Sequence, residues 1–334
     1  MRLIISFFFL LLTLFSGAAQ NNGELTEEKY LELQDKIRFS VNGDNDEGLG
    51  YVNQMLKSKN DMHKAFAYGA GSYLYQLKGN ADKSEKMYAE AIKQLSKIPE
   101  SNEKTKLQAY LCNYRGLTYW KRSNYGKALG SYQEGVKLSS KINDVVQIVK
   151  FKANIALLNE SVGNYQLSIK ILKQNEAFLD KNESLYEKDQ FQNSKSNTYT
   201  NLGNSYEGYY SKNRQKSYLL DSAEYYYKKS VAYSDKFIDN KTTAKLSLGN
   251  IYVFKKDFTN AEKIYYDISF YAKQVDNESL YQVACFNLGD LYYSIKKYDR
   301  ALIFLKKVDS ISQKNKKVDI SFFRSNYIQA KIYS

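Results

Sequence analysis

Proline and cysteine are nearly absent from this sequence of 334 residues, which contains one Pro and two Cys. Because proline and glycine interrupt regular structure, one Pro and 17 Gly leave little of the chain for loops or disordered linkers. Two cysteines are too few for an exported disulfide scaffold. The one histidine, His63, cannot build the usual zinc sites, and neither His-Glu-x-x-His nor Cys-x-x-Cys occurs. The sequence therefore predicts an ordered chain with no metal or cofactor site.

Candidates for catalysis are equally scarce. A Ser-His-Asp arrangement would have to recruit His63, which we interpret as a solvated histidine in a linker. The stretch from Gly69 to Gly71 lacks the third Gly, the Lys and the preceding strand of a nucleotide-binding loop. The stretch from Asp44 to Gly48 is a poor calcium loop, since Met55 stands where the closing Glu should be. We therefore expect no enzyme and no small-molecule substrate.

The N-terminus predicts export from a bacterial cell. Met1-Arg2 is followed by an apolar run from Leu3 to Phe15 and by the small residues Gly17-Ala18-Ala19. This order is typical of a secretory signal peptide, and the run is too short to span a bilayer. We expect a signal peptide over residues 1–19 with cleavage after Ala19, and an uncleaved anchor is the alternative. The mature chain would be periplasmic, envelope-associated or secreted.

Two recurring phrases are the main signal in the rest of the chain. Asn201-Leu202-Gly203-Asn204-Ser205-Tyr206 returns with small changes at 247–252 and at 287–292, and the phrase at 257–261 returns at 297–301. These phrases resemble the tetratricopeptide repeat (TPR), whose unit of about 34 residues is a helix–turn–helix. The resemblance implies an all-α fold: a right-handed superhelical solenoid of stacked TPR-like hairpins.

The family's pattern sets the expected domain boundaries. An array is expected over residues 65–334, with units starting near 65, 109, 149, 196, 242 and 282 and an incomplete one near 323. Residues 24–60 predict a further hairpin that caps the array, with a polar turn from Asn42 to Glu47 between its helices. Ser334 would end the first helix of a unit. Either that helix packs on the preceding hairpin, or the chain is a fragment of a longer protein.

Side chains at fixed positions of the unit support this register. Position 8, where the two helices cross, is always small: Ser72, Gly116, Ala156, Gly203, Gly249, Gly289 and Ala330. Position 24 is mostly tyrosine: Tyr88, Tyr132, Tyr227 and Tyr265. We expect these rings to fill the seam between stacked hairpins.

Two further expectations follow from the register. About eight extra residues between Gly203 and Ala223 extend the helices there or form a loop. Cys112 and Cys285 both stand at position 4, three units apart, so we expect two unpaired core residues.

The formal net charge of +13 first suggests a nucleic-acid partner. However, the lysines are spread over helix ends and turns, and basic and aromatic residues do not alternate as in a single-strand binding surface. Export would also remove the chain from nucleic acid. We expect no nucleic-acid binding, and weak attraction to an anionic surface or an acidic partner stays open.

In the TPR family, fixed positions of each first helix face a concave groove that binds a partner. Carried over to this sequence, those positions give Tyr110, Asn113, Tyr114, Trp120, Lys121, Lys150, Asn154, Asn197, Asn201, Asn204, Asn250, Phe254, Phe286, Asn287, Asp290 and Tyr293. Amides can bond a peptide backbone, and aromatic rings can anchor apolar groups. The resemblance thus implies a non-catalytic scaffold that binds a peptide or helix of another envelope protein in this groove.

Two alternatives stay open at this point. The asparagines could form no more than a polar helix face. The chain could also be the sensor portion of a bacterial signalling or transcription-regulator protein, whose transmembrane and output domains are absent from this chain. The sequence does not predict an oligomeric state.

Overall fold

The computed structural model describes residues 25–334 except 42, 317 and 318. The predicted signal peptide and Asn42 of the predicted polar turn lie outside the described residues. Every regular element within the described part is a helix, and no strand occurs there. The predicted all-α fold is confirmed.

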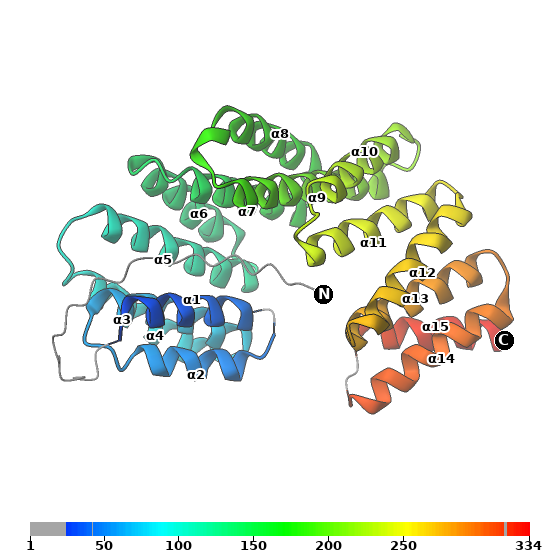
Figure 1. Ribbon diagram of the computed structural model, residues 1–334, viewed down its shortest axis with the longest axis horizontal. Helices are drawn as coiled ribbons and strands as arrows, with labels where there is room; N and C mark the ends of the chain where they lie inside the picture. The colour runs from blue at the N-terminus through cyan, green and yellow to red at the C-terminus, as the bar shows by residue number, and fades with distance from the viewer. Residues whose placement is uncertain (1–24, 42, 317–318) are drawn as a thin grey trace, which may run out of the picture. The chain divides into compact units, whose positions relative to one another are not determined.

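The chain divides into two compact units, Met1–Pro99 and Glu100–Ser334. The described part of the first unit holds four helices: α1 (Glu27–Ser40), α2 (Asn45–Met55), α3 (Asp61–Leu77) and α4 (Ala81–Leu95). Each of these helices packs against the next one in the chain (Figure 1). The unit is therefore a pair of consecutive helical hairpins.

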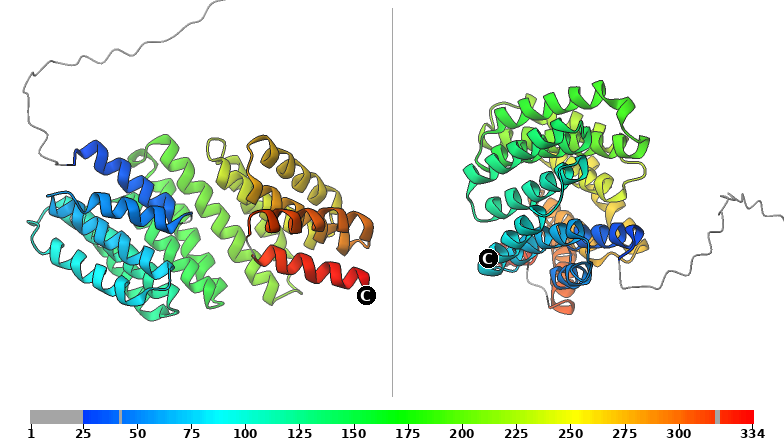
Figure 2. Two further views of the ribbon diagram at one scale, coloured as in Figure 1. Left: turned by 90° about the horizontal axis from the view of Figure 1, so that it is seen from below. Right: turned by 90° about the vertical axis from the view of Figure 1, so that its left-hand side faces the viewer.

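The second unit continues the same arrangement. Its helices are α5 (Asn102–Lys121), α6 (Tyr125–Lys141), α7 (Val145–Ser161), α8 (Tyr165–Lys181), the short 3-10 helix η1 (Glu183–Leu185), α9 (Lys188–Lys212), α10 (Tyr218–Ala232), α11 (Ile238–Phe254), α12 (Phe258–Gln274), α13 (Glu278–Ser294), α14 (Tyr298–Lys314) and α15 (Ile320–Tyr333). Consecutive α-helices pack together, and α7 also contacts α5 and α9 (Figures 1 and 2). Contacts between successive odd-numbered helices are typical of stacked hairpins, in which each odd-numbered helix is the first helix of its hairpin.

A repeated turn joins the helices. Ser123 has φ +57° and is followed by Asn124, whose side chain accepts a hydrogen bond from the backbone N–H of Lys127. Lys256, with φ +62°, and Asp257 repeat this pair at the start of α12. A left-handed residue ends one helix and the Asn or Asp after it caps the next. This pair of residues explains why so few glycines and prolines suffice for the turns.

The small residue at position 8 makes room for the side chain at position 24 of the same hairpin. A Cβ atom on Gly116, Gly203 or Gly249 would lie closer than 3.0 Å to the ring of Tyr132, Tyr227 or Tyr265, respectively. The predicted close crossing is therefore present. The three rings also reach the next hairpin, as predicted. The ring centroids of Tyr132 and Phe151 of α7 lie 6.4 Å apart, and Tyr227 and Tyr265 share buried clusters with residues of α11 and α13, respectively.

The extra residues predicted between Gly203 and Ala223 extend α9, the first helix of the α9–α10 hairpin. Helix α9 has 25 residues and runs past Tyr209 to Lys212, before a turn over 213–217 leads into α10. Tyr165 of α8 stacks on Tyr209 with ring centroids 6.4 Å apart, and Gln166 donates a hydrogen bond to the Tyr209 hydroxyl at 2.9 Å. These contacts hold the extension against the preceding hairpin.

His63 differs from its predicted setting. It lies in α3 and is only 4% exposed, because its ring stacks on Tyr30 of α1 with centroids 4.0 Å apart. Its Nδ1 is 2.9 Å from the Ser58 hydroxyl. The interpretation as a solvated linker histidine is therefore wrong, since α3 begins at Asp61 and already includes this residue.

The two cysteines are free, as expected. Cys285 is buried and Cys112 is half-buried. The last helix, α15, packs on α13 and α14 and buries Ile328, whereas Phe323 and Tyr327 stay exposed.

Candidate partner-binding face

All sixteen predicted binding residues lie on the first helices of the second unit, α5, α7, α9, α11 and α13. We call the side of these helices that carries the residues the first-helix face. Lys121, Lys150 and Asn197 are exposed there, and most of the others are half-buried. Tyr114 and Phe286 are 7% and 6% exposed. They belong to the core, so their prediction as contact residues is corrected.

Asparagine side chains link neighbouring first helices along this face. Asn154 of α7 donates from Nδ2 to Oδ1 of Asn113 in α5 at 2.9 Å. Asn240 of α11 donates in the same way to Asn193 of α9 at 2.7 Å. Sequence reasoning missed Asn193 and Asn240 because both precede the unit starts set by the family pattern. Part of the predicted amide set is thus used to hold the helices together.

Two other asparagines are oriented by buried tyrosines. The Tyr227 hydroxyl lies 2.8 Å from Oδ1 of Asn204, and the Tyr265 hydroxyl lies 2.6 Å from Oδ1 of Asn250. Since the hydroxyl donates to the oxygen, each amide is fixed with its NH₂ group on the other side. Neither Nδ2 atom has a hydrogen-bond partner among the residues that the structure describes. The face therefore carries two fixed amide donors, one on each of two consecutive hairpins.

Carboxylates stand beside these donors. Glu207 Oε2 lies 2.7 Å from the Tyr227 hydroxyl and shares its single proton with Oδ1 of Asn204, and Glu160 accepts from the Ser205 hydroxyl at 2.7 Å. Burial raises the pKa of both carboxyls, and the charge of Glu160 raises that of Glu207 further. Burial also raises the pKa of Asp290, against the opposing effect of Arg324 at 3.8 Å.

The carboxylates are close enough to act on a shared neighbour. The pKa of Tyr265 is raised by burial and then by the charges of Asp290 and Glu207. The first-helix face is thus locally acidic in a chain whose net charge is +13. Sequence reasoning named Asp290 but missed both glutamates. Glu160 and Glu207 occupy in their units the position of Trp120 and Tyr293, so the same spacing could have found them.

The described ranges contain neither a candidate metal-binding group nor a candidate membrane-spanning helix. No group of three or more His, Cys, Asp or Glu there could hold a metal ion. None of the helices in these ranges is both long enough and apolar enough to cross a membrane.

Comparison with known proteins agrees with the repeat. Residues 283–315 match the family model of the tetratricopeptide repeat, which describes a repeat and not an enzyme. No curated protein matches the chain.

Solved structures extend the likeness over most of the chain. The apo form of RapI has a TM-score of 0.62 at 12% identity, covering 91% of this chain and 82% of RapI. A Rap protein complexed with competence and sporulation factor has a TM-score of 0.56 at 11% identity, covering 92% and 86%. A signal transduction ATPase with a tetratricopeptide repeat sensor from Pyrococcus horikoshii has a TM-score of 0.55 at 17% identity, covering 92% and 42%. At these identities the likeness shows the fold alone, a solenoid of TPR-like hairpins.

Proposed function

We propose that this solenoid of TPR-like hairpins is a non-catalytic scaffold, whose first-helix face binds an extended segment of a partner protein. The observation that carries the proposal is the pair of fixed amide donors on Asn204 and Asn250. An extended backbone presents carbonyl oxygens at regular intervals, and two donors on consecutive hairpins can bond two of them. Because buried hydroxyls already hold the amides in place, binding costs little side-chain entropy.

The local charge adds a preference to this binding. Glu160, Glu207 and Asp290 favour a segment that carries a lysine or arginine, since opposite charges attract most strongly where water is partly excluded. A structural neighbour with this fold is named as a complex with competence and sporulation factor, which supports partner binding by such a solenoid.

The proposal includes the place where the protein acts. The sequence of residues 1–19 supports export, so the partner would be another protein of the cell envelope. Fractionation of the source cells and N-terminal sequencing of the recovered chain test this part separately. A chain that starts at Met1 in the cytoplasmic fraction contradicts it, without bearing on the binding face.

The binding face is tested with a double variant, Asn204→Ala with Asn250→Ala. Both variant and wild-type chains are crosslinked in the source cells, and bound proteins are identified by mass spectrometry. A dominant partner of the wild-type chain should be lost from the variant by about tenfold or more, because removing groups that bond a ligand costs more than 1 kcal/mol each at the best sites. A Glu207→Gln variant should weaken binding and reduce its dependence on salt.

The matched control removes two amides elsewhere. Gln133 of α6 and Gln174 of α8 are exposed on second helices, so Gln133→Ala with Gln174→Ala should leave the partner in place. Circular dichroism confirms that both double variants are folded. If the two double variants retain the partner equally, the first-helix face is not the binding site.

A further inference from the structure

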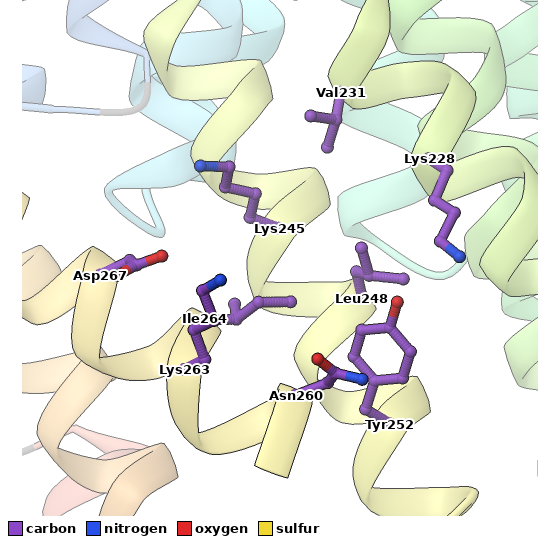
Figure 3. Close-up of a pocket in the computed structure, with 9 residues that line it drawn as sticks. All are labelled: Lys228, Val231, Lys245, Leu248, Tyr252, Asn260, Lys263, Ile264 and Asp267. Carbon is purple, nitrogen blue, oxygen red and sulfur yellow. The ribbon is translucent and has the colours of Figure 1, made fainter. Parts of the chain in front are cut away.

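A pocket of about 310 Å³ lies between α10, α11 and α12, away from the fixed amide donors (Figure 3). Its apolar lining includes Leu248, Tyr252 and Ile264, and its polar lining includes Lys228, Lys245 and Lys263. Nothing in the sequence pattern pointed to this place. Its origin becomes clear when the hairpin is compared with its two neighbours.

Both neighbouring hairpins fill the same space with a stacked pair of rings. Tyr206 and Tyr226 stack with centroids 5.6 Å apart and planes at 10°, and Tyr292 and Phe304 stack at 5.7 Å and 19°. Tyr252 has the same position in its unit as Tyr206 and Tyr292.

The second ring of the pair is missing in this hairpin. Ile264 stands where the neighbouring hairpins have Tyr226 and Phe304. No ring stacks on Tyr252 within the described part of the chain. An aromatic group that enters the pocket can therefore complete the pair that the two neighbouring hairpins form internally.

The charged side chains that line the pocket determine which charge a ligand should carry beside its aromatic ring. Lys245 is half-buried at a position where the neighbouring units have the buried residues Tyr199 and Cys285. Lys245 and Lys263 make no ion pair or hydrogen bond with any described residue. Lys228, which is also part of the lining, is paired with Glu224 at 2.6 Å.

The balance of charge in the lining is positive. Asp267 is its one carboxylate against the two unpaired lysines Lys245 and Lys263, and it makes no ion pair with any described residue. The pocket therefore favours an anionic group over a cationic one.

A second hollow beside the pocket favours a chain segment as the ligand. This hollow measures about 220 Å³, shares Lys245 and Asp267 with the pocket and extends between α11 and α12 to Ile238 and Tyr271. Two hollows in series along one helix fit two side chains of one segment better than a single compact molecule.

We propose that this pocket binds an aromatic side chain of a partner protein, carried in a segment with acidic residues beside the ring. The ring packs on Tyr252, between Leu248 and Ile264, and the neighbouring carboxylates pair with Lys245 and Lys263. This site has the opposite charge preference to the first-helix face. It goes beyond the proposed function, because either surface can bind without the other.

The probe is a fluorescently labelled peptide, Asp-Glu-Trp-Glu-Asp, whose binding to the purified chain is followed by anisotropy at low salt. Replacing Trp by Ala, or all four acidic residues by Lys, should weaken binding by about tenfold or more, because each change removes one of the two recognised groups. Equal binding of the Ala peptide would mean that charge alone attracts the probe, and the proposal would be wrong.

Two variants of the chain test the pocket itself. Ile264→Phe supplies the ring that the neighbouring hairpins have, so it should weaken binding about tenfold while the thermal midpoint stays the same or rises. Lys245→Glu should weaken binding to a similar extent. Lys306→Glu is the matched control: this exposed lysine of α14 lies outside the pocket, so binding should change by less than about twofold.

The outcomes separate this proposal from the proposed function. Binding of the probe should be unchanged in the Asn204→Ala, Asn250→Ala double variant, because those residues do not line the pocket. If the folded Ile264→Phe and Lys245→Glu variants both bind the probe as the wild-type chain does, the pocket is not its site, whatever the first-helix face binds.

Discussion

Gly249 and the ring of Tyr265 meet where α11 crosses α12, and there is no room between them for a single methyl group. The ring is 1% exposed and its hydroxyl is bonded to Asn250 at 2.6 Å, so it cannot move aside without loss of that bond. This contact therefore couples the close crossing of one hairpin to the orientation of an amide on the first-helix face.

The Gly249→Ala variant should be destabilised. Forcing a methyl group against a buried ring costs about 1–3 kcal/mol of the free energy of unfolding, even though alanine favours helices. Gly130→Ala in α6 is the control, because a Cβ there meets nothing within 4 Å and should gain about 0.5–1 kcal/mol. Urea denaturation of both variants measures the difference. Equal stability of the two variants would show that the crossing relaxes at no cost.

The first unit should lose stability in mild acid through His63. Burial lowers the pKa of its imidazole below the ordinary 6.5, and Glu27 at 3.8 Å offsets this only in part. Between the lowered pKa and 6.5, the unfolded chain binds more protons than the folded one, so stability rises with pH there. The contribution is complete above about pH 6.5 and decreases as the pH falls below it.

Hydrogen exchange of the α3 amides, measured between about pH 7.5 and pH 5, detects this change. The His63→Gln variant should lose the histidine component of the pH dependence, since glutamine does not titrate in this range. If the stability of the wild-type chain depends on pH in the same way as that of the variant, His63 is not the cause of the pH dependence.

The ion pair between the buried Lys195 and the exposed Asp180 should lose different amounts of stability when one or the other side chain is removed. The Lys195 side chain is 2% exposed and that of Asp180 is 59% exposed, with Nζ and Oδ1 2.5 Å apart. Asp180→Ala leaves a buried ammonium without its counter-charge and should cost about 1–3 kcal/mol. Lys195→Met removes that charge and keeps the packing on Phe191 and Tyr199, so we expect a change of less than about 1 kcal/mol. Urea midpoints decide the order, and a larger loss for Lys195→Met would contradict this account.

Much of the fold follows from residue size and spacing. Small residues at position 8 and tyrosines at position 24 predicted helical hairpins because only small residues allow helices to cross so closely. The sequence could not show that two of these rings also hold the amides of Asn204 and Asn250, because those hydrogen bonds form only after folding. It also could not show that His63 is covered, because Tyr30 stands 33 residues earlier in the chain and stacks on it only after folding.

The candidate binding face was partly predictable for a similar reason. Helical spacing indicated which asparagines share a face. It could not distinguish Asn113, which is bonded to Asn154, from Asn204, whose NH₂ group stays available. Whether the NH₂ group of Asn204 is available depends on Tyr227 of the facing helix. The spacing of residues within one helix does not predict contacts with another helix.

The pocket beside Tyr252 lies where a second aromatic ring is missing. The two neighbouring hairpins have two stacked rings at this place, whereas this hairpin has Tyr252 and Ile264. Codons for isoleucine and phenylalanine differ by as little as one base, so a point mutation can open or close such a space while the backbone stays the same. A solenoid of similar hairpins can therefore vary its surface one hairpin at a time, while the other hairpins preserve the scaffold.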